Sequence, residues 1–304
     1  MKKKDEMSEV LTTAEIFERL QKPTVKLGFK RTAEKLPLGA SKFGGNPAAP
    51  RDFAWPFYRG KSDDGATANR PLTFLMQLNL EEVAPYDVEK RLPTRGLLAF
   101  FIERIALENE ASDAVRVFYF DGPVDETVET APPPEFAELE QETIFSWDYG
   151  AEFAITFEKG VSVPCSWDLD DYGIELAVAD DEDEDEAFER YEEERDALTG
   201  TPPNGDFSQA LGIAHWIQWS MLGECERLVA GLSRDEFAAL PEAERAKFEE
   251  NAPNWTLLCR LGTVADGDDE AATWGDCGSF YFCVREDDLK RGDFSRVRIF
   301  FQCF

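Results

Sequence analysis

Three short blocks of this chain occur twice in the same order, and this repetition limits the folds that the sequence can adopt. The matching blocks are 72–78 with 255–261, 96–102 with 278–284, and 115–118 with 297–300. The offset is 183 residues for the first pair and 182 for the other two. Such self-similarity at a nearly constant spacing predicts two related units, each with three strands.

The composition of these blocks predicts buried strands. The last unit reads Trp274-Gly275-Asp276-Cys277-Gly278, then a run of aromatic and branched residues to Val284, and a second such run from Val297 to Phe304. Aromatic and β-branched residues favour strands, and glycines favour the turns before them. We therefore expect the C-terminal segment to lie within a sheet.

A glycine-rich block precedes the strands of each unit. Phe43-Gly44-Gly45-Asn46-Pro47 pairs, more weakly, with Leu211-Gly212-Ile213-Ala214-His215. Helices are expected at the margins, where Thr12 with Glu15 and Ser233 with Glu236 match the capping-box pattern. Strand runs separated by long insertions predict an α+β fold, predominantly antiparallel β, with internally duplicated β-rich halves and peripheral helices.

One domain over residues 1–304 is expected. Its first β-rich repeat spans about 36–123, a linker with an acidic insertion spans 124–206, and the second repeat spans about 207–304. Strict alternation over residues 152–158 predicts a half-exposed strand. The acidic run 180–195 predicts a disordered loop that leads into a solvated helix, in which only Phe188 and Tyr191 can touch a core.

The net charge of −30 argues against nucleic acid and anionic membranes as partners, because both bind basic surfaces. A basic protein or a small ligand remains open as a partner. The start at Lys2–Lys4 leads into a polar segment, and no apolar run approaches the ~20 residues that cross a bilayer, so a cytoplasmic protein is expected. The six cysteines are interpreted as reduced thiols, mostly in the core, and no metal or cofactor is expected.

Few residues suggest chemistry. His215 is the single histidine, which excludes most catalytic triads and histidine-rich metal sites and favours a hydrogen-bonded structural role. Asp276 lies between two glycines, where its carboxylate is expected to bond nearby amides and fix the turn. The acidic segment 266–270 together with Asp276 does not have the spacing of a calcium loop, and we expect a solvated loop there.

Tryptophans stand beside glycine or proline turns in both units. Trp55, Trp216, Trp219 and Trp274 either fill the core or border a cleft where the units meet, and the sequence leaves both interpretations open. The cleft hypothesis predicts a groove with seven lining residues, namely Trp55, Gln77, His215, Trp216, Gln218, Trp274 and Asp276.

With these blocks described, the chain resembles the YwqG-like family, a domain of unknown function. The resemblance is carried by Phe43–Pro47, Trp55-Pro56, Phe74–Leu78, Leu97–Phe101, His215–Gln218, Trp274–Gly278 with Tyr281-Phe282, and Phe301–Cys303. It implies a predominantly β, internally repeated domain. It implies no activity, so no catalytic residue can be transferred.

The leading functional hypothesis is a non-catalytic binding or interaction protein, of which an immunity-like protein with an acidic face for a basic partner is one form. The alternative is an enzyme that acts on a small molecule with His215 or Asp276 as acid or base. A third interpretation is an adaptor without any groove.

Overall fold

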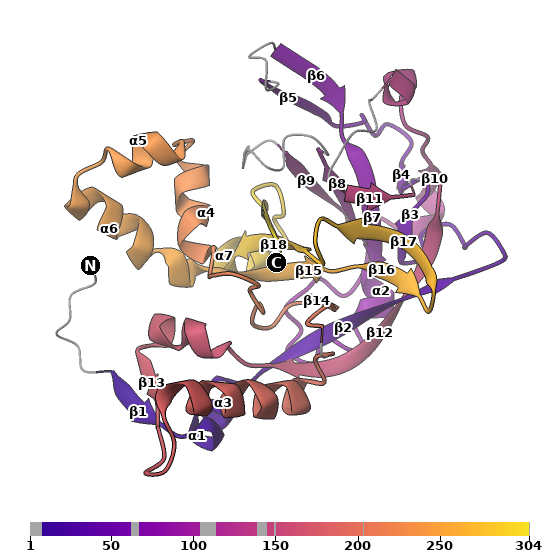
Figure 1. Ribbon diagram of the computed structural model, residues 1–304. Coiled ribbons are helices and arrows are strands. Elements are labelled where there is room, and N and C mark those ends of the chain that lie inside the picture. The colour runs from indigo at the N-terminus through magenta and orange to yellow at the C-terminus, as the bar shows by residue number, and fades with distance from the viewer. Residues whose placement is uncertain are drawn as a thin grey trace.

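The computed structural model describes residues 8–61, 67–103, 114–138, 145–148, 150–202 and 204–303. It has the α+β, predominantly antiparallel architecture that the sequence predicts (Figure 1). The lysines at positions 2–4 and Phe304, the last residue of the final predicted strand, lie outside the described residues.

Ten strands form one antiparallel sheet in the order β19-β18-β15-β14-β2-β12-β3-β7-β8-β9. Their bounds are β2 Lys22–Arg31, β3 Lys42–Gly44, β7 Thr73–Asn79, β8 Leu97–Ile102, β9 Val115–Phe120, β12 Glu152–Ser162, β14 Ser208–Ala210, β15 Trp255–Leu261, β18 Ser279–Arg285 and β19 Arg298–Gln302. The strands expected from the repeated blocks and from the alternation at 152–158 are confirmed. The long strand β2 was not predicted.

The two ends of the sheet are meanders with matching registers. One consists of β7, β8 and β9, and the other of β15, β18 and β19. The register of the first shifts between Phe74 and Met76, and that of the second shifts between Leu257 and Cys259. The irregularity therefore falls at the same point of both meanders, at Leu75 and at Leu258, which the offset of 183 aligns.

The centre of the sheet is the antiparallel pair β2 and β12, joined through ten residue pairs. β2 continues to β14 and the later meander, whereas β12 continues to β3 and the earlier meander. Each meander is thus attached to a long strand from the other part of the chain. Gly28 lies opposite Thr156 in this central pair. On either side of the pair, the sheet continues with one short strand and then a three-stranded meander.

The glycine-rich blocks correspond with a shift of one residue from the predicted match. The β3–β7 and β14–β15 registers align Gly44 with Leu211 and Gly45 with Gly212. All four residues have positive φ, at 71°, 62°, 66° and 76° respectively. The backbone conformation is therefore repeated even at Leu211, although leucine rarely adopts a positive φ and glycine does so readily.

The sheet curls until its two meanders face each other across the core, which gives a nearly closed barrel. Phe100 of β8 and Phe282 of β18 have ring centroids 5.1 Å apart. Near the sheet edges, Arg91 makes an ion pair of 2.6 Å with Glu286. The inward side chains form the main hydrophobic core.

Shorter elements cover the outer face of each meander (Figure 1). The meander β7–β9 is covered by the segment that contains β4 (Ala48–Pro50), β5 (Phe57–Lys61) and β6 (Thr67–Pro71). β10 (Thr127–Glu129) pairs with β4. The second meander is covered by the segment leading to α4 (Leu222–Val229), which is followed by α5 (Arg234–Ala238) and α6 (Glu242–Glu250). The remaining elements are β1 (Glu9–Leu11), α1 (Thr13–Leu20), α2 (Leu80–Val83), β11 (Phe145–Trp147), β13 (Ile174–Leu176), α3 (Glu184–Thr199), β16 (Val264–Asp266), β17 (Asp269–Trp274), α7 (Glu286–Arg291) and four short 3-10 turns within the described residues.

The acidic run leads into a helix, as the sequence predicts. It forms α3, whose N-terminus is closed by a capping box between Asp183 and Glu186. Tyr191 is fully buried as expected, but Phe188 is 42% exposed, and Ala187 and Arg195 occupy the buried face in its place. The predicted helix is therefore α3, and its buried face includes Tyr191 but not Phe188.

All six cysteines are free thiols. Cys165, Cys225, Cys259 and Cys283 are buried, as the sequence suggests, whereas Cys277 is exposed in the turn before β18. None of the described helices combines the length and the apolar character needed to span a bilayer.

The exchange of long strands predicts that the two parts of the chain cannot fold separately. A fragment of residues 1–138 has β2 without β12 or β14, and a fragment of residues 139–304 has β12 without β2 or β3. We expect each fragment alone to be poorly structured, because it exposes unpaired strand edges. The two co-expressed fragments should co-elute as one complex with native circular dichroism. Two independently folded monomers would contradict this topology.

Candidate functional site

The central strand pair has one apolar face and one polar face. Its core face carries four buried side chains, Val25, Leu27, Phe153 and Ile155. Its outer face carries Lys26 opposite Glu158 and Gly28 opposite Thr156. The alternation follows from the period of two in a strand.

A row of polar side chains crosses four strands on this outer face. Directly opposite residues of antiparallel strands share a face. By the registers of these strands, the row consists of Glu158 of β12, Lys26 of β2, Gln209 of β14 and Arg260 of β15. Neighbouring strands are about 5 Å apart, so the row spans roughly 15 Å.

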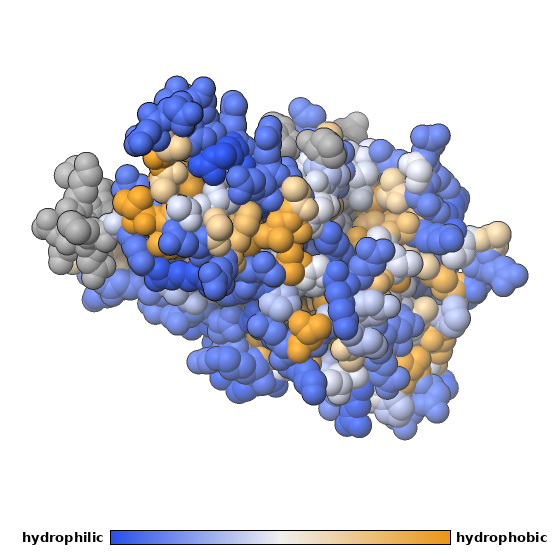
Figure 2. All heavy atoms as spheres, turned by 90° about the horizontal axis from the view of Figure 1, so that it is seen from below, coloured by the Kyte–Doolittle hydropathy of each residue, from blue (hydrophilic) through white to orange (hydrophobic). Residues whose placement is uncertain are grey.

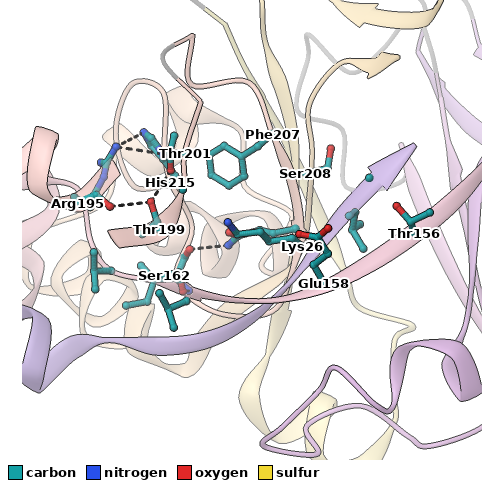
Figure 3. A pocket seen from close by; sticks show the side chains of 17 residues that line it. Lys26, Thr156, Glu158, Ser162, Arg195, Thr199, Thr201, Phe207, Ser208 and His215 are labelled. Atoms are coloured by element: carbon teal, nitrogen blue, oxygen red, sulfur yellow. Dashed lines mark hydrogen bonds between the residues drawn. The ribbon is translucent and has the colours of Figure 1, made fainter. Parts of the chain in front are cut away.

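A cavity of about 310 Å³ lies over part of this row (Figure 3). Its floor is formed by β2, β12 and β14, and its walls by the end of α3 and by residues 200, 201, 207, 213 and 215. The polar lining residues are Lys26, Thr156, Glu158, Ser162, Arg195, Thr199, Thr201, Ser208, Gln209 and His215. This volume suits a small molecule.

Gly200 brings the chain close to the floor at the end of α3. Its φ of 65° is left-handed, and its N–H donates to Asp196 O at 2.8 Å, which ends the helix. A Cβ at this position would lie 2.8 Å from Lys26 Nζ. The lysine ammonium therefore lies at the C-terminal end of a helix, where the helix dipole favours positive charge.

Arg195 forms the base of one wall. Its guanidinium is buried and makes ion pairs with Glu192 at 2.5 Å and with Asp196 at 2.6 Å. Nη2 also lies 3.2 Å from Nε2 of His215 and 3.5 Å from Nδ1. Figure 3 shows the arginine and the imidazole facing each other. Arg195 is thus neutralised by carboxylates and holds the histidine ring in place.

His215 is neutral in this environment. Burial lowers its pKa well below the usual value, and the nearby positive charges of Arg195 and Arg260 lower it further. The ring also packs against Phe207, with centroids 5.5 Å apart. A neutral ring nitrogen can accept a hydrogen bond from Arg195, which matches the predicted structural role.

Arg260 lies behind the wall formed by Phe207. Its side chain is almost fully buried, and its Cζ lies 4.0 Å from the centroid of the Phe207 ring. Nη2 donates to Gly205 O at 2.8 Å, and Nε donates to Ser279 Oγ at 3.2 Å. Nη1 has no hydrogen-bond partner within the described residues, and no described carboxylate forms an ion pair with this arginine.

Three of the predicted groove residues are buried away from the cavity. Gln77 accepts from Ala48 N at 2.9 Å and donates to Ala40 O at 2.7 Å. Trp274 is fully buried and donates to Gly262 O at 2.7 Å, and Trp216 stacks on Tyr281 with centroids 4.4 Å apart. Each side chain is satisfied where it lies and has a structural role.

The other predicted groove residues are dispersed. Trp55 donates to Leu72 O at 2.8 Å and lines a smaller cavity of about 70 Å³. Gln218 is exposed and donates to Cys303 O at 2.9 Å. Asp276 is exposed, and its carboxylate makes no hydrogen bond within the described residues. Of the seven, His215 alone lines the 310 Å³ cavity.

The acidic segment after β16 contacts the end of β2. Asp269 makes an ion pair of 2.7 Å with Arg31, and Asp266 accepts from Arg31 N at 3.2 Å. Among the residues that the structure describes, no group of three His, Cys, Asp or Glu side chains is arranged to hold a metal ion.

Sequence reasoning missed most of the cavity residues. Lys26 lies in an unpredicted strand, although Val25, Leu27 and Phe29 alternate with polar neighbours and could have revealed it. Arg195 and Thr199 lie in a helix that was expected to be solvated. No local sequence pattern predicts that these segments lie close together, because their proximity depends on tertiary contacts.

Comparison with known protein families gives one result for most of the chain. Residues 41–303 match the family described as domain of unknown function (DUF1963). The chain belongs to the DUF1963 family. The matched region contains α3, β12, β14 and β15, and therefore every cavity residue except those of β2. No curated protein matches the sequence.

Asp168, close to Arg195, provides a test of the electrostatics behind the cavity. Burial, followed by the charges of Asp171 and Glu192, raises its pKa to about 7 from an ordinary 3.8. The native state therefore keeps a proton that the unfolded state has already lost, and stability decreases as pH rises from about 4 through 7. We expect Asp168→Asn to raise the free energy of unfolding at pH 8 by on the order of 2 kcal/mol and to change little at pH 4.

Denaturant unfolding at both pH values measures this effect. The matched control is Asp170→Asn, which alters an exposed carboxylate two residues away. An equal effect of Asp168→Asn at pH 4 and pH 8 would show that this carboxyl is not protonated in the folded protein.

Proposed function

We propose that this DUF1963 protein binds a small polar molecule in the cavity over the central strands. The observation that carries the proposal is the 310 Å³ space on the polar face of β2 and β12. Its floor has Lys26 and Gln209, and its wall has hydroxyl groups and a fixed imidazole. Ligand sites combine a concave shape with a few placed polar groups, as this cavity does.

The surroundings of His215 favour binding over acid–base catalysis. A general base needs an accessible ring nitrogen and a pKa near the working pH. Arg195 contacts the ring nitrogens, and burial together with two arginines depresses the pKa. The enzyme alternative with His215 as base therefore requires Arg195 to move, and Asp276 does not line this cavity.

Blocking the cavity tests the binding proposal. Thr156 is exposed at the floor, so Thr156→Trp should fold while its indole occupies the space. We expect ligands captured from a small-molecule extract, detected by native mass spectrometry, to bind at least about tenfold more weakly to this variant. Thr94→Trp, at an exposed turn outside the cavity, is the matched control. Equal capture by wild type and both variants would refute the site.

A basic protein partner is a second candidate function, supported by the charge distribution. The side of the molecule that carries α1 and α3 is mostly hydrophilic, with separated hydrophobic spots (Figure 2). α3 presents Asp185, Glu189 and Glu193 to solvent. A fixed acidic helix within a chain of net charge −30 suits a cationic surface, as an immunity-like role would require.

Charge reversal on α3 tests the second candidate. Asp185→Lys, Glu189→Lys and Glu193→Lys together should abolish salt-sensitive capture of a stoichiometric partner from native lysate. The matched control reverses Glu242, Glu244 and Glu250, which are exposed on α6. Equal capture by both triple variants would show that the acidic face of α3 does not bind the partner.

Three narrower assignments belong to the same proposal. We propose that the chain arose by internal duplication, which the matching registers and the irregularities at Leu75 and Leu258 support. We assign it to the YwqG-like group within its family on the Trp274–Gly278 block. A cytoplasmic location is supported by six free thiols, which remain reduced in that compartment.

A further inference from the structure

Lys26 is a cation at the floor of the cavity that has no ion-pair partner among the described residues. Within the described residues its ammonium makes no ion pair, and the side chain is half-buried. Glu158 lies directly across the strand pair, yet the two side chains do not pair. The ammonium instead lies beside Gly200, at the end of α3. The floor therefore presents an unused positive charge.

Arg260, two strands away in the same row, adds a second charge without an ion pair among the described residues, although the charge of Asp206 acts on it. Its guanidinium is almost fully buried, lacks a described carboxylate partner and has a free Nη1. Burial of an unpaired charge is costly, and stacking on Phe207 and Tyr281 offsets only part of that cost. Gln209 lies between Arg260 and Lys26 in the sheet. An anion above Gln209 would thus lie beside Lys26, with the charge of Arg260 behind the Phe207 ring.

The wall residues are consistent with a positive field. Arg195 is already paired with Glu192 and Asp196, so it adds little net charge. The pKa of His215 is nevertheless depressed by Arg195 and Arg260 in addition to burial. Glu158 is exposed at the rim, where water screens its charge.

We propose that the ligand of this cavity carries an anionic group, a carboxylate or a phosphate, that pairs with Lys26 beside Arg260. This proposal rests on the proposed binding function and specifies the chemistry of its ligand. The anion supplies the ion-pair partner that the described side chains do not provide for Lys26. The overall charge of −30 slows the approach of anions, so the site selects by local pairing and not by long-range attraction.

Probes of equal size and different charge test the proposal. The series is succinate, erythritol and 1,4-diaminobutane, each with four carbons, and inorganic phosphate distinguishes phosphate from carboxylate recognition. His215 is the single histidine, so its ring signals in a tag-free protein report cavity occupancy by NMR without assignment. We expect succinate or phosphate to shift these signals saturably, and erythritol and 1,4-diaminobutane to leave them unchanged.

Lys26→Ala should weaken anion binding at least tenfold. Lys30→Ala, an exposed lysine on the same face of the same strand, should change it less than twofold. Anion binding that is unchanged in Lys26→Ala, or no response to either anion at 50 mM, would overturn the proposal. Binding of erythritol or 1,4-diaminobutane that is lost in Thr156→Trp would also overturn it, but would leave the proposed binding function standing.

Discussion

The pairing of β2 with β12 is the interaction on which the rest of this structure depends. Its ten residue pairs join two meanders that otherwise share no backbone pairing. One face of the pair supplies Val25 and Phe153 to the core, and the other presents polar side chains to the cavity. A change of register by one residue would exchange these faces and remove both the core and the site.

The symmetry of the sheet does not extend to the segments that cover it. Three residues after Gly212 stands His215, whereas three residues after Gly45 stands Ala48, which is held by Gln77. Arg260 of β15 occupies the position that corresponds to Gln77 of β7, because the offset of 183 aligns these two strands. The insertion that contains α3 covers one side of the central pair. A nearly symmetric framework therefore carries an asymmetric cavity.

The strands of both meanders could be predicted because their aromatic runs are local signals and occur twice. β2 was missed because Pro23 marked the end of a helix and drew attention away from the alternation that follows. His215 was singled out for being the sole histidine, not for its surroundings. Lys26, Arg195 and Gln209 could not be combined from sequence, since they come from three separate elements that only the registers and α3 bring together.

The central claim is that ligand recognition by this protein occurs at the strand pair β2 and β12. Hydrogen exchange with mass spectrometry, with and without a small-molecule extract, tests it most directly, because bound ligands slow exchange of the amides around them. The account predicts protection in β2, β12 and residues 199–209, with no change in the turn at residues 275–278. Protection confined to that turn or to the exposed face of α3, with the central strands unchanged, would contradict it.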